Sequence, residues 1–138
     1  MSDDERAIMA VIEAEAAAYW NKDFDAFACC WVQARHVRRM GWWERSGIRM
    51  QRGWDEIAAR MRQVMAESPV PNPNAAIVRR DNLSITVIGD MAWLTFDQTG
   101  IETGDRDMDM PGVSHETRVM ERHGGDWKIA YVGFLLRG

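Results

Sequence analysis

Two charged residues near the C-terminus, Glu116 and Arg118, have the types and spacing best suited to chemistry. They are two positions apart, so in a β-strand both side chains lie on the same face. We expect Ile129 on that face too, which makes it a core face where an unsatisfied charge is costly. One interpretation is a pocket floor, where Arg118 binds a carboxylate or enolate and Glu116 orients it. The other is a structural ion pair that closes the fold.

A third charged residue, Glu15, falls within an apolar helical stripe that contains Val11, Ile12 and Tyr19. Burial of a carboxyl group disfavours its charged form and raises its pKa, which suits a general acid or base near neutral pH. Glu15 is therefore the candidate catalytic residue. The alternative is that it pairs with Arg118 or another arginine and has no catalytic role.

Further polar and aromatic residues are candidates for ligand contacts. Gln98 extends an expected apolar sheet face toward the mouth of a pocket, and Tyr131 is expected opposite Arg118. Both side chains can fix the polar groups of a ligand. Trp43 and Trp54 are candidate pocket walls, although indole rings also commonly fill protein cores.

The remaining composition excludes several functional classes. A net charge of -4 and a pI of about 5.4 provide no basic field for nucleic acid or an anionic membrane. We expect no cofactor and no metal site, because metal ligands must converge and the histidines are dispersed: His36, His115 and His123. The adjacent Cys29 and Cys30 are interpreted as small buried apolar residues. With no signal-like start and no membrane-length apolar run, we expect a cytoplasmic protein.

The first half of the chain has the hydrophobic period of helices. Apolar residues recur at helical spacing over residues 3–20, again after Asp23, and over residues 54–67. Two short strands are expected at residues 37–43 and near Ile48. A proline-rich run over residues 69–73 ends the helical part, because proline lacks the backbone donor.

After that run the period changes to two, which predicts four strands, near residues 76–88, 91–102, 113–122 and 127–136. Helices followed by strands predict an α+β domain, and the length allows one domain over residues 1–138. The segment Asp105–Met110 is expected to be an exposed mobile loop.

Two tight turns, Gly89-Asp90 and Gly124-Gly125, fix the register of these strands. The first turn places Asp97 on one face and six apolar residues on the other: Leu83, Ile85, Val87, Ala92, Leu94 and Phe96. The second turn places Glu121 opposite Lys128, where we expect a cross-strand ion pair.

The last expected strand is apolar on both faces. Helices can cover only one of them, so the other needs a second layer, which a second copy of the same sheet would supply. We therefore expect a homodimer through the outer sheet face, burying about 1,200–2,000 Å².

The order of elements, together with four short stretches, resembles the nuclear transport factor 2-like (NTF2-like) superfamily and its SnoaL-like group. The stretches are Trp20–Phe24, Gly89–Trp93, His115–Arg122 and Gly125–Ile129. The resemblance implies a cone-shaped α+β fold, in which three N-terminal helices pack on a strongly curved antiparallel sheet and the open end holds a small organic molecule. It is poorly specific for function, because one fold hosts many activities.

The ketosteroid isomerases of that superfamily provide a residue-by-residue comparison. By this resemblance, Glu15 stands where they have an oxyanion-hole tyrosine, Arg39 near their base, and Arg118 near their neutral acid. An arginine does not act as a base, since its pKa stays above ~12. The resemblance therefore implies the geometry of those enzymes without their mechanism. Gly133 stands where related families often have a histidine, and is expected to leave space in the cone.

Three functions follow as hypotheses. The first is binding of a small anionic or carbonyl-containing molecule in the cone. The second is a cofactor-free isomerase, cyclase or dehydratase, with Glu15 as acid–base and Arg118 stabilising an oxyanion. The third is a non-catalytic dimeric interaction module whose cone is filled by its own tryptophans.

Overall fold

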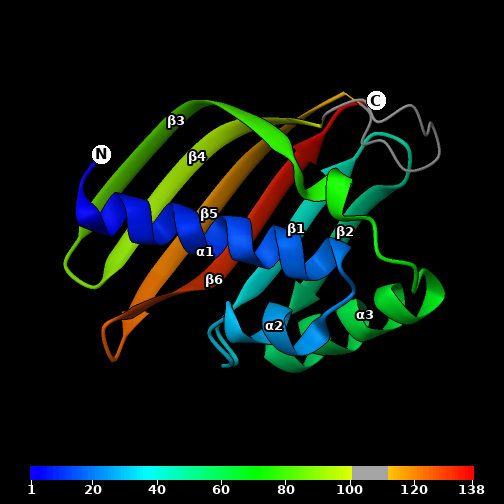
Figure 1. Ribbon diagram of the computed structural model, residues 1–138, viewed down its shortest axis with the longest axis horizontal. Coiled ribbons are helices and arrows are strands. Elements are labelled where there is room, and N and C mark those ends of the chain that lie inside the picture. Colours follow the sequence, from blue (N-terminus) through cyan, green and yellow to red (C-terminus); the bar gives the residue numbers. More distant parts are fainter. Residues whose placement is uncertain (101–111) are drawn as a thin grey trace.

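The computed structural model describes residues 1–100 and 112–138 and contains an α+β architecture (Figure 1). The predicted loop Asp105–Met110 lies outside the described residues. The elements, in chain order, are α1 (Asp3–Trp20), α2 (Phe24–Cys29), β1 (Arg38–Trp43), β2 (Gly47–Arg52), α3 (Trp54–Glu67), the 3-10 helix η1 (Pro73–Ala76), β3 (Val78–Ile88), β4 (Met91–Gly100), β5 (Val113–His123) and β6 (Asp126–Leu136).

Local sequence explains where the helices begin. The Ser2 side chain accepts a hydrogen bond from the Glu5 amide at the start of α1, and the Asp23 side chain accepts one from the Ala26 amide at the start of α2. Helix α3 follows Gly53, whose φ of 83° is readily available only to glycine. No helix among the described residues is long and apolar enough to cross a membrane.

The six strands form one sheet in the order β2-β1-β6-β5-β4-β3. Four of the five neighbouring pairs are antiparallel, but β1 and β6 run parallel, so the sheet is mixed rather than entirely antiparallel as expected. Helix α1 crosses one face of the sheet, and α2 and α3 lie toward its β1–β2 end (Figure 1). We call the face that packs against α1 the inner face, and the opposite one the outer face.

The core lies between α1 and the inner face. Ile8 and Ile12 of α1 are buried together with residues of the central strands: Leu94, Phe96, Met120 and Ile129. Each such side chain contributes roughly 1.5–3 kcal/mol by leaving water. This core fixes α1 over β4, β5 and β6, so that the helix residues facing inward lie opposite the same strands.

A β-bulge in β3 corrects one predicted register. Asp81 pairs with Asp97, but the next pair is Ser84 with Thr95, so β3 has one extra residue between them. The bulge contains Asn82, with a φ of 57°, and Leu83, which is 37% exposed. Leu83 therefore lies outside the regular pairing and outside the core, whereas Ala92, Leu94 and Phe96 are buried as predicted.

A second bulge, between β5 and β6, moves Tyr131 to the outer face. Val119 pairs with Tyr131, whereas Met120 pairs with Ile129, so Ala130 is the extra residue. Arg118 is consequently opposite Val132, and the predicted position of Tyr131 opposite Arg118 is wrong. Gly133 also lies on the outer face, where the Tyr131 ring covers it, so it leaves no space in the cone.

Near the turn between β5 and β6, Glu121 pairs with Lys128 in the strand register, as predicted. The predicted ion pair between their side chains does not form. The Lys128 ammonium instead donates to the Cys29 carbonyl oxygen at 2.5 Å, and Glu121 pairs with His36 and His123. Cys30 is buried as expected, whereas Cys29 is exposed.

Candidate functional site

A cavity of about 580 Å³ lies between α1, α3 and the inner face of the sheet. Five of the candidate residues line it: Glu15, Trp43, Gln98, Glu116 and Arg118. Trp54 does not line it and instead packs in an aromatic cluster, with ring centroids 6.3 Å from those of Phe24 and Trp31. We call this cavity the inner pocket.

The charges that the described residues contribute to the inner pocket are strongly unequal. Its lining includes two carboxylate residues, Glu15 and Glu116, and six arginines: Arg39, Arg45, Arg49, Arg60, Arg80 and Arg118. This cationic lining belongs to a protein whose net charge is -4. The arrangement therefore concentrates positive charge where a ligand would lie.

Glu116 and Arg118 form a buried ion pair at the pocket floor. Their side chains are 6% and 7% exposed, and Arg118 Nη1 lies 2.7 Å from Glu116 Oε1. The Ser114 hydroxyl donates to the other carboxylate oxygen, so Glu116 is well satisfied. This pair supports the structural interpretation for Glu116, while Arg118 keeps further donors for another partner.

Three guanidinium groups stack on two phenyl rings beside this pair. Arg80 and Arg118 lie 5.6 and 5.4 Å from the centroid of Phe96, and Arg39 lies 5.0 Å from that of Phe134. Such cation–π contacts hold a guanidinium in place without neutralising its charge. The rings therefore position the arginines and leave their positive charge available.

Two of these arginines were not predicted as ligand contacts. Arg80 falls on the outer face if residues are counted back from the Gly89-Asp90 turn, and only the β3 bulge turns it inward. Arg39 shares a face with Trp43, because residues two or four apart in a strand lie on one face. This alternation in the sequence could have identified Arg39 as a pocket residue. Gln98 pairs with Arg80 and extends the inner face as predicted.

Glu15 is held in the pocket by a tryptophan. Trp31 Nε1 donates to Glu15 Oε2 at 2.7 Å, and Trp31 itself is buried. Burial raises the pKa of the Glu15 carboxyl, and this effect exceeds the opposing attraction of the Arg118 guanidinium. The raised pKa makes Glu15 a group able to hold or release a proton beside Arg118.

Three buried side-chain nitrogens of the described residues lack a hydrogen-bond partner: Trp43 Nε1, Arg80 Nε and Arg118 Nε. All three are donors, and all three belong to residues that line the inner pocket. A buried donor without a partner costs roughly 1–3 kcal/mol. A ligand with hydrogen-bond acceptors would therefore satisfy donors of this pocket.

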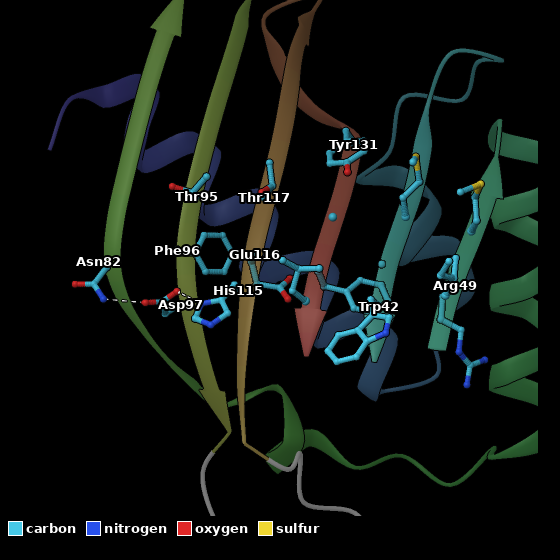
Figure 2. Close-up of a pocket in the computed structure, with 17 residues that line it drawn as sticks. Trp42, Arg49, Asn82, Thr95, Phe96, Asp97, His115, Glu116, Thr117 and Tyr131 are labelled. Atoms are coloured by element: carbon cyan, nitrogen blue, oxygen red, sulfur yellow. Dashed lines mark hydrogen bonds and ion pairs between the residues drawn. The ribbon is translucent and has the colours of Figure 1, made fainter. Parts of the chain in front are cut away.

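The outer face contains a second hollow, a groove of about 630 Å³ that includes Tyr131 (Figure 2). At one end of it Asn82 Nδ2 donates to Asp97 Oδ2 at 2.8 Å, and Asp97 Oδ1 lies 2.7 Å from His115 Nδ1. These hydrogen bonds, first that of Asn82, hold the pKa of Asp97 below its ordinary 3.8. The groove has fewer cationic side chains than the inner pocket, because its lining contains one arginine, Arg49.

Among the described residues, no group of three His, Cys, Asp or Glu side chains is placed to hold a metal ion.

The chain resembles known proteins in both sequence and structure. The family model of the SnoaL-like domain matches residues 8–134. An NTF-2 like protein of unknown function from Shewanella oneidensis has a TM-score of 0.66 at 14% identity, covering 96% of this chain and 98% of its own. A protein of unknown function with a cystatin-like fold from Nostoc punctiforme has a TM-score of 0.71 at 15% identity, covering 98% and 92%. A proposed dehydratase of the NTF2-like family from Streptomyces avermitilis has a TM-score of 0.68 at 18% identity, covering 96% of this chain and 95% of its own.

No curated protein sequence matches the chain. At these identities the structural likeness shows the fold alone.

Proposed function

Since this chain belongs to the SnoaL-like domain family, we propose that its inner pocket binds a small organic molecule that carries an anionic or carbonyl group. The observation that carries the proposal is the lining of six arginines against two glutamates. Guanidinium groups are forked donors suited to carboxylate oxygens. A volume of about 580 Å³ is within the range of small-molecule sites.

An anion is expected to bind because it would compensate buried positive charge in the pocket. Arg118 has Glu116 as a buried partner, but no carboxylate among the described residues lies within 4.0 Å of Arg39. A cation held away from water is destabilised until an anion pairs with it. A bound carboxylate would supply this anion, and a carbonyl oxygen would accept from the same donors more weakly.

The test is thermal unfolding with small carboxylates and ketones, in the wild-type protein and two variants. Arg80→Gln removes a pocket arginine, and Arg79→Gln removes the same charge from the neighbouring residue, whose side chain is 70% exposed. A carboxylate at ~100 times its dissociation constant adds ~2.7 kcal/mol, so we expect the midpoint to rise by several degrees in the wild type and in Arg79→Gln. The rise should be much smaller in Arg80→Gln.

Two results would contradict the proposal. The first is a wild-type protein whose midpoint no carboxylate or ketone moves. The second is an equal loss of the shift in Arg79→Gln and Arg80→Gln, which would assign the effect to net charge rather than to the pocket.

A second candidate function is a cofactor-free isomerase, cyclase or dehydratase. The observation that favours it is Glu15, a carboxyl with a raised pKa that faces the pocket beside Arg118. Glu15 would accept a proton from the carbon next to a carbonyl, and Arg118 would stabilise the resulting enolate oxygen. The fold is compatible with chemistry of this kind, since the Streptomyces avermitilis protein that shares it is a proposed dehydratase.

Proton exchange separates this candidate from simple binding. Small cyclic ketones in D2O would exchange their α-hydrogens faster with the wild-type protein than with Glu15→Gln, as followed by NMR. Equal exchange with both proteins would rule out Glu15 as the base for these ketones. An interaction module with a cone filled by tryptophans is disfavoured by the open volume of the inner pocket.

A further inference from the structure

The arginines of the inner pocket form two separate groups, and we propose that the ligand is a small organic dianion with one acidic group bound at each. This inference rests on the proposed binding function and specifies its substrate class. The first group is Arg80 and Arg118, stacked on Phe96. The second group is Arg39, stacked on Phe134.

Strand register places the two groups on opposite sides of Glu116. Phe96 of β4 pairs with Glu116 of β5, and Glu116 pairs with Phe134 of β6, so the three side chains form one row across the inner face. Neighbouring strands are ~4.8 Å apart, which separates the backbones of the two phenylalanines by roughly 10 Å. The arginines of the two groups therefore stack on rings that are anchored two strands apart.

The second group is the less compensated of the two. Arg39 Nη1 donates to the neutral Gln51 Oε1 at 3.2 Å, and none of the described carboxylates lies within 4.0 Å of it. Burial lowers the pKa of Arg39, although its guanidinium stays cationic. Glu15 and Glu116 attract Arg39 from beyond 4.0 Å. In the first group Arg118 has Glu116, and the carboxylate of the described residues that pairs with Arg80 is that of Glu13, at 3.9 Å and 67% exposed. Among the described residues, each group thus has at least one arginine with no buried carboxylate within 4.0 Å.

The row of residues next to that of Glu116 places an apolar side chain between the two groups. Val132 of β6 pairs with Arg118 on one side and with Arg39 on the other, so an apolar side chain separates the two cations. Gly41 pairs with Phe134 and leaves room for its ring, since a methyl group at Gly41 would overlap it. A ligand with a short apolar chain and an acidic group at each end matches this order of contacts.

The experiment measures binding of straight-chain dicarboxylates, from glutarate to suberate, each against the monocarboxylate with the same number of carbons. Monomethyl adipate is a further probe, because it keeps the adipate skeleton and masks one acid. A second charge-assisted contact corresponds to about tenfold or more in affinity. We expect at least one dicarboxylate to bind that much more tightly than its monocarboxylate and, at the adipate length, than the monoester.

Three variants assign the effect to the two groups. Arg39→Gln and Arg80→Gln should each reduce the affinity of the preferred dicarboxylate to that of its monocarboxylate, whereas Arg79→Gln should retain the difference. Circular dichroism checks that the variants fold. If Arg39→Gln is unfolded, Arg39→Lys replaces it, and it should retain part of the difference because the charge is kept without the fork.

The outcomes distinguish this inference from the proposed function. Monocarboxylates that bind as tightly as every dicarboxylate would overturn the dianion while leaving anion binding in place. A wild-type protein that binds none of the carboxylates would overturn both. A dicarboxylate preference that survives in Arg39→Gln would overturn the assignment of the second acidic group to Arg39.

Discussion

Glu15 shows at the scale of one residue how burial and charge oppose each other in the pocket. Its ordinary pKa is 4.5, and burial raises it despite the nearby Arg118 and Arg39. The folded protein then holds a proton that the unfolded chain releases as the pH rises above 4.5. The contribution of Glu15 to the free energy of unfolding therefore falls over this range, until the pKa of the folded state is passed.

Glu15→Gln removes this titration while keeping an oxygen that accepts from Trp31. We expect the free energy of unfolding of Glu15→Gln, relative to that of the wild type, to increase between pH 4 and pH 7. Urea unfolding at several pH values measures it. The control is Glu13→Gln, which removes the same charge from the same helix at a side chain that is 67% exposed. A difference that stays constant or decreases with pH would mean that the two arginines outweigh burial.

For single residues, helix and strand periodicity predicted the correct face where the local structure is regular. Glu15 on α1 and Glu116 and Arg118 on β5 line the inner pocket, as the periods of the helix and the strand predict. Arg80 was not predicted as a pocket residue, because its face depends on a bulge two residues further along. A period of two reverses at each extra residue, and no local signal in the sequence reveals where that residue is.

At the scale of elements, the bulge in β3 depends on Asn82. Its φ of 57° is disfavoured for most residues with a side chain, and asparagine tolerates it because its amide forms local hydrogen bonds. Here that amide donates to Asp97, on the neighbouring strand. The bulge in turn places Arg80 on the inner face, so a residue on the outer surface determines part of the pocket.

Asn82→Ala and Asn82→Gly separate the two contributions of this residue. Both remove the hydrogen bond to Asp97, but only alanine is strained at this φ, by roughly 1–2 kcal/mol. We expect the alanine variant to have the lower free energy of unfolding by about that amount, as measured by urea unfolding. Equal stability of the two would mean that the strand relaxes into another register, which would also move Arg80.

The second bulge explains the incorrect prediction for Tyr131. The Gly124-Gly125 turn correctly gives Glu121 opposite Lys128, and the register holds as far as Met120 opposite Ile129. The extra residue, Ala130, then exchanges the two faces of β6. Both candidate faces of this strand are apolar, so hydrophobic pattern alone does not indicate the exchange. Turn chemistry thus predicted the two hairpins, while the parallel pairing of β1 with β6 and the sheet face of a residue beyond a bulge required the structure.

At the scale of the whole molecule, the helices cover only one face of the sheet (Figure 1). Seven large apolar residues at outer-face register positions are exposed: Trp42, Ile48, Met50, Ile88, Met91, Trp93 and Leu135. Those on β1, β2 and β6 line the outer groove, and the other three lie on β3 and β4 at the opposite end of the sheet. An apolar surface of this extent is typical of an interaction site. We propose that a second copy of the chain covers it, because the same face on two copies is self-complementary under a two-fold axis.

Sedimentation of the wild type and two variants tests this homodimer. Leu135→Arg places a charge on β6 in the middle of the outer face, where Leu135 is 56% exposed, and the charge would have to be buried in the dimer. Val70→Arg places the same charge at a residue that is 72% exposed in the segment between α3 and η1, away from the sheet. We expect the wild type and Val70→Arg to sediment as dimers of the 15.8 kDa chain at micromolar concentration, and Leu135→Arg as a folded monomer. A wild type that is monomeric throughout this range would show that the outer face is not covered by a second copy. Dissociation of both variants alike would assign the effect to net charge, because only Leu135 belongs to the outer face.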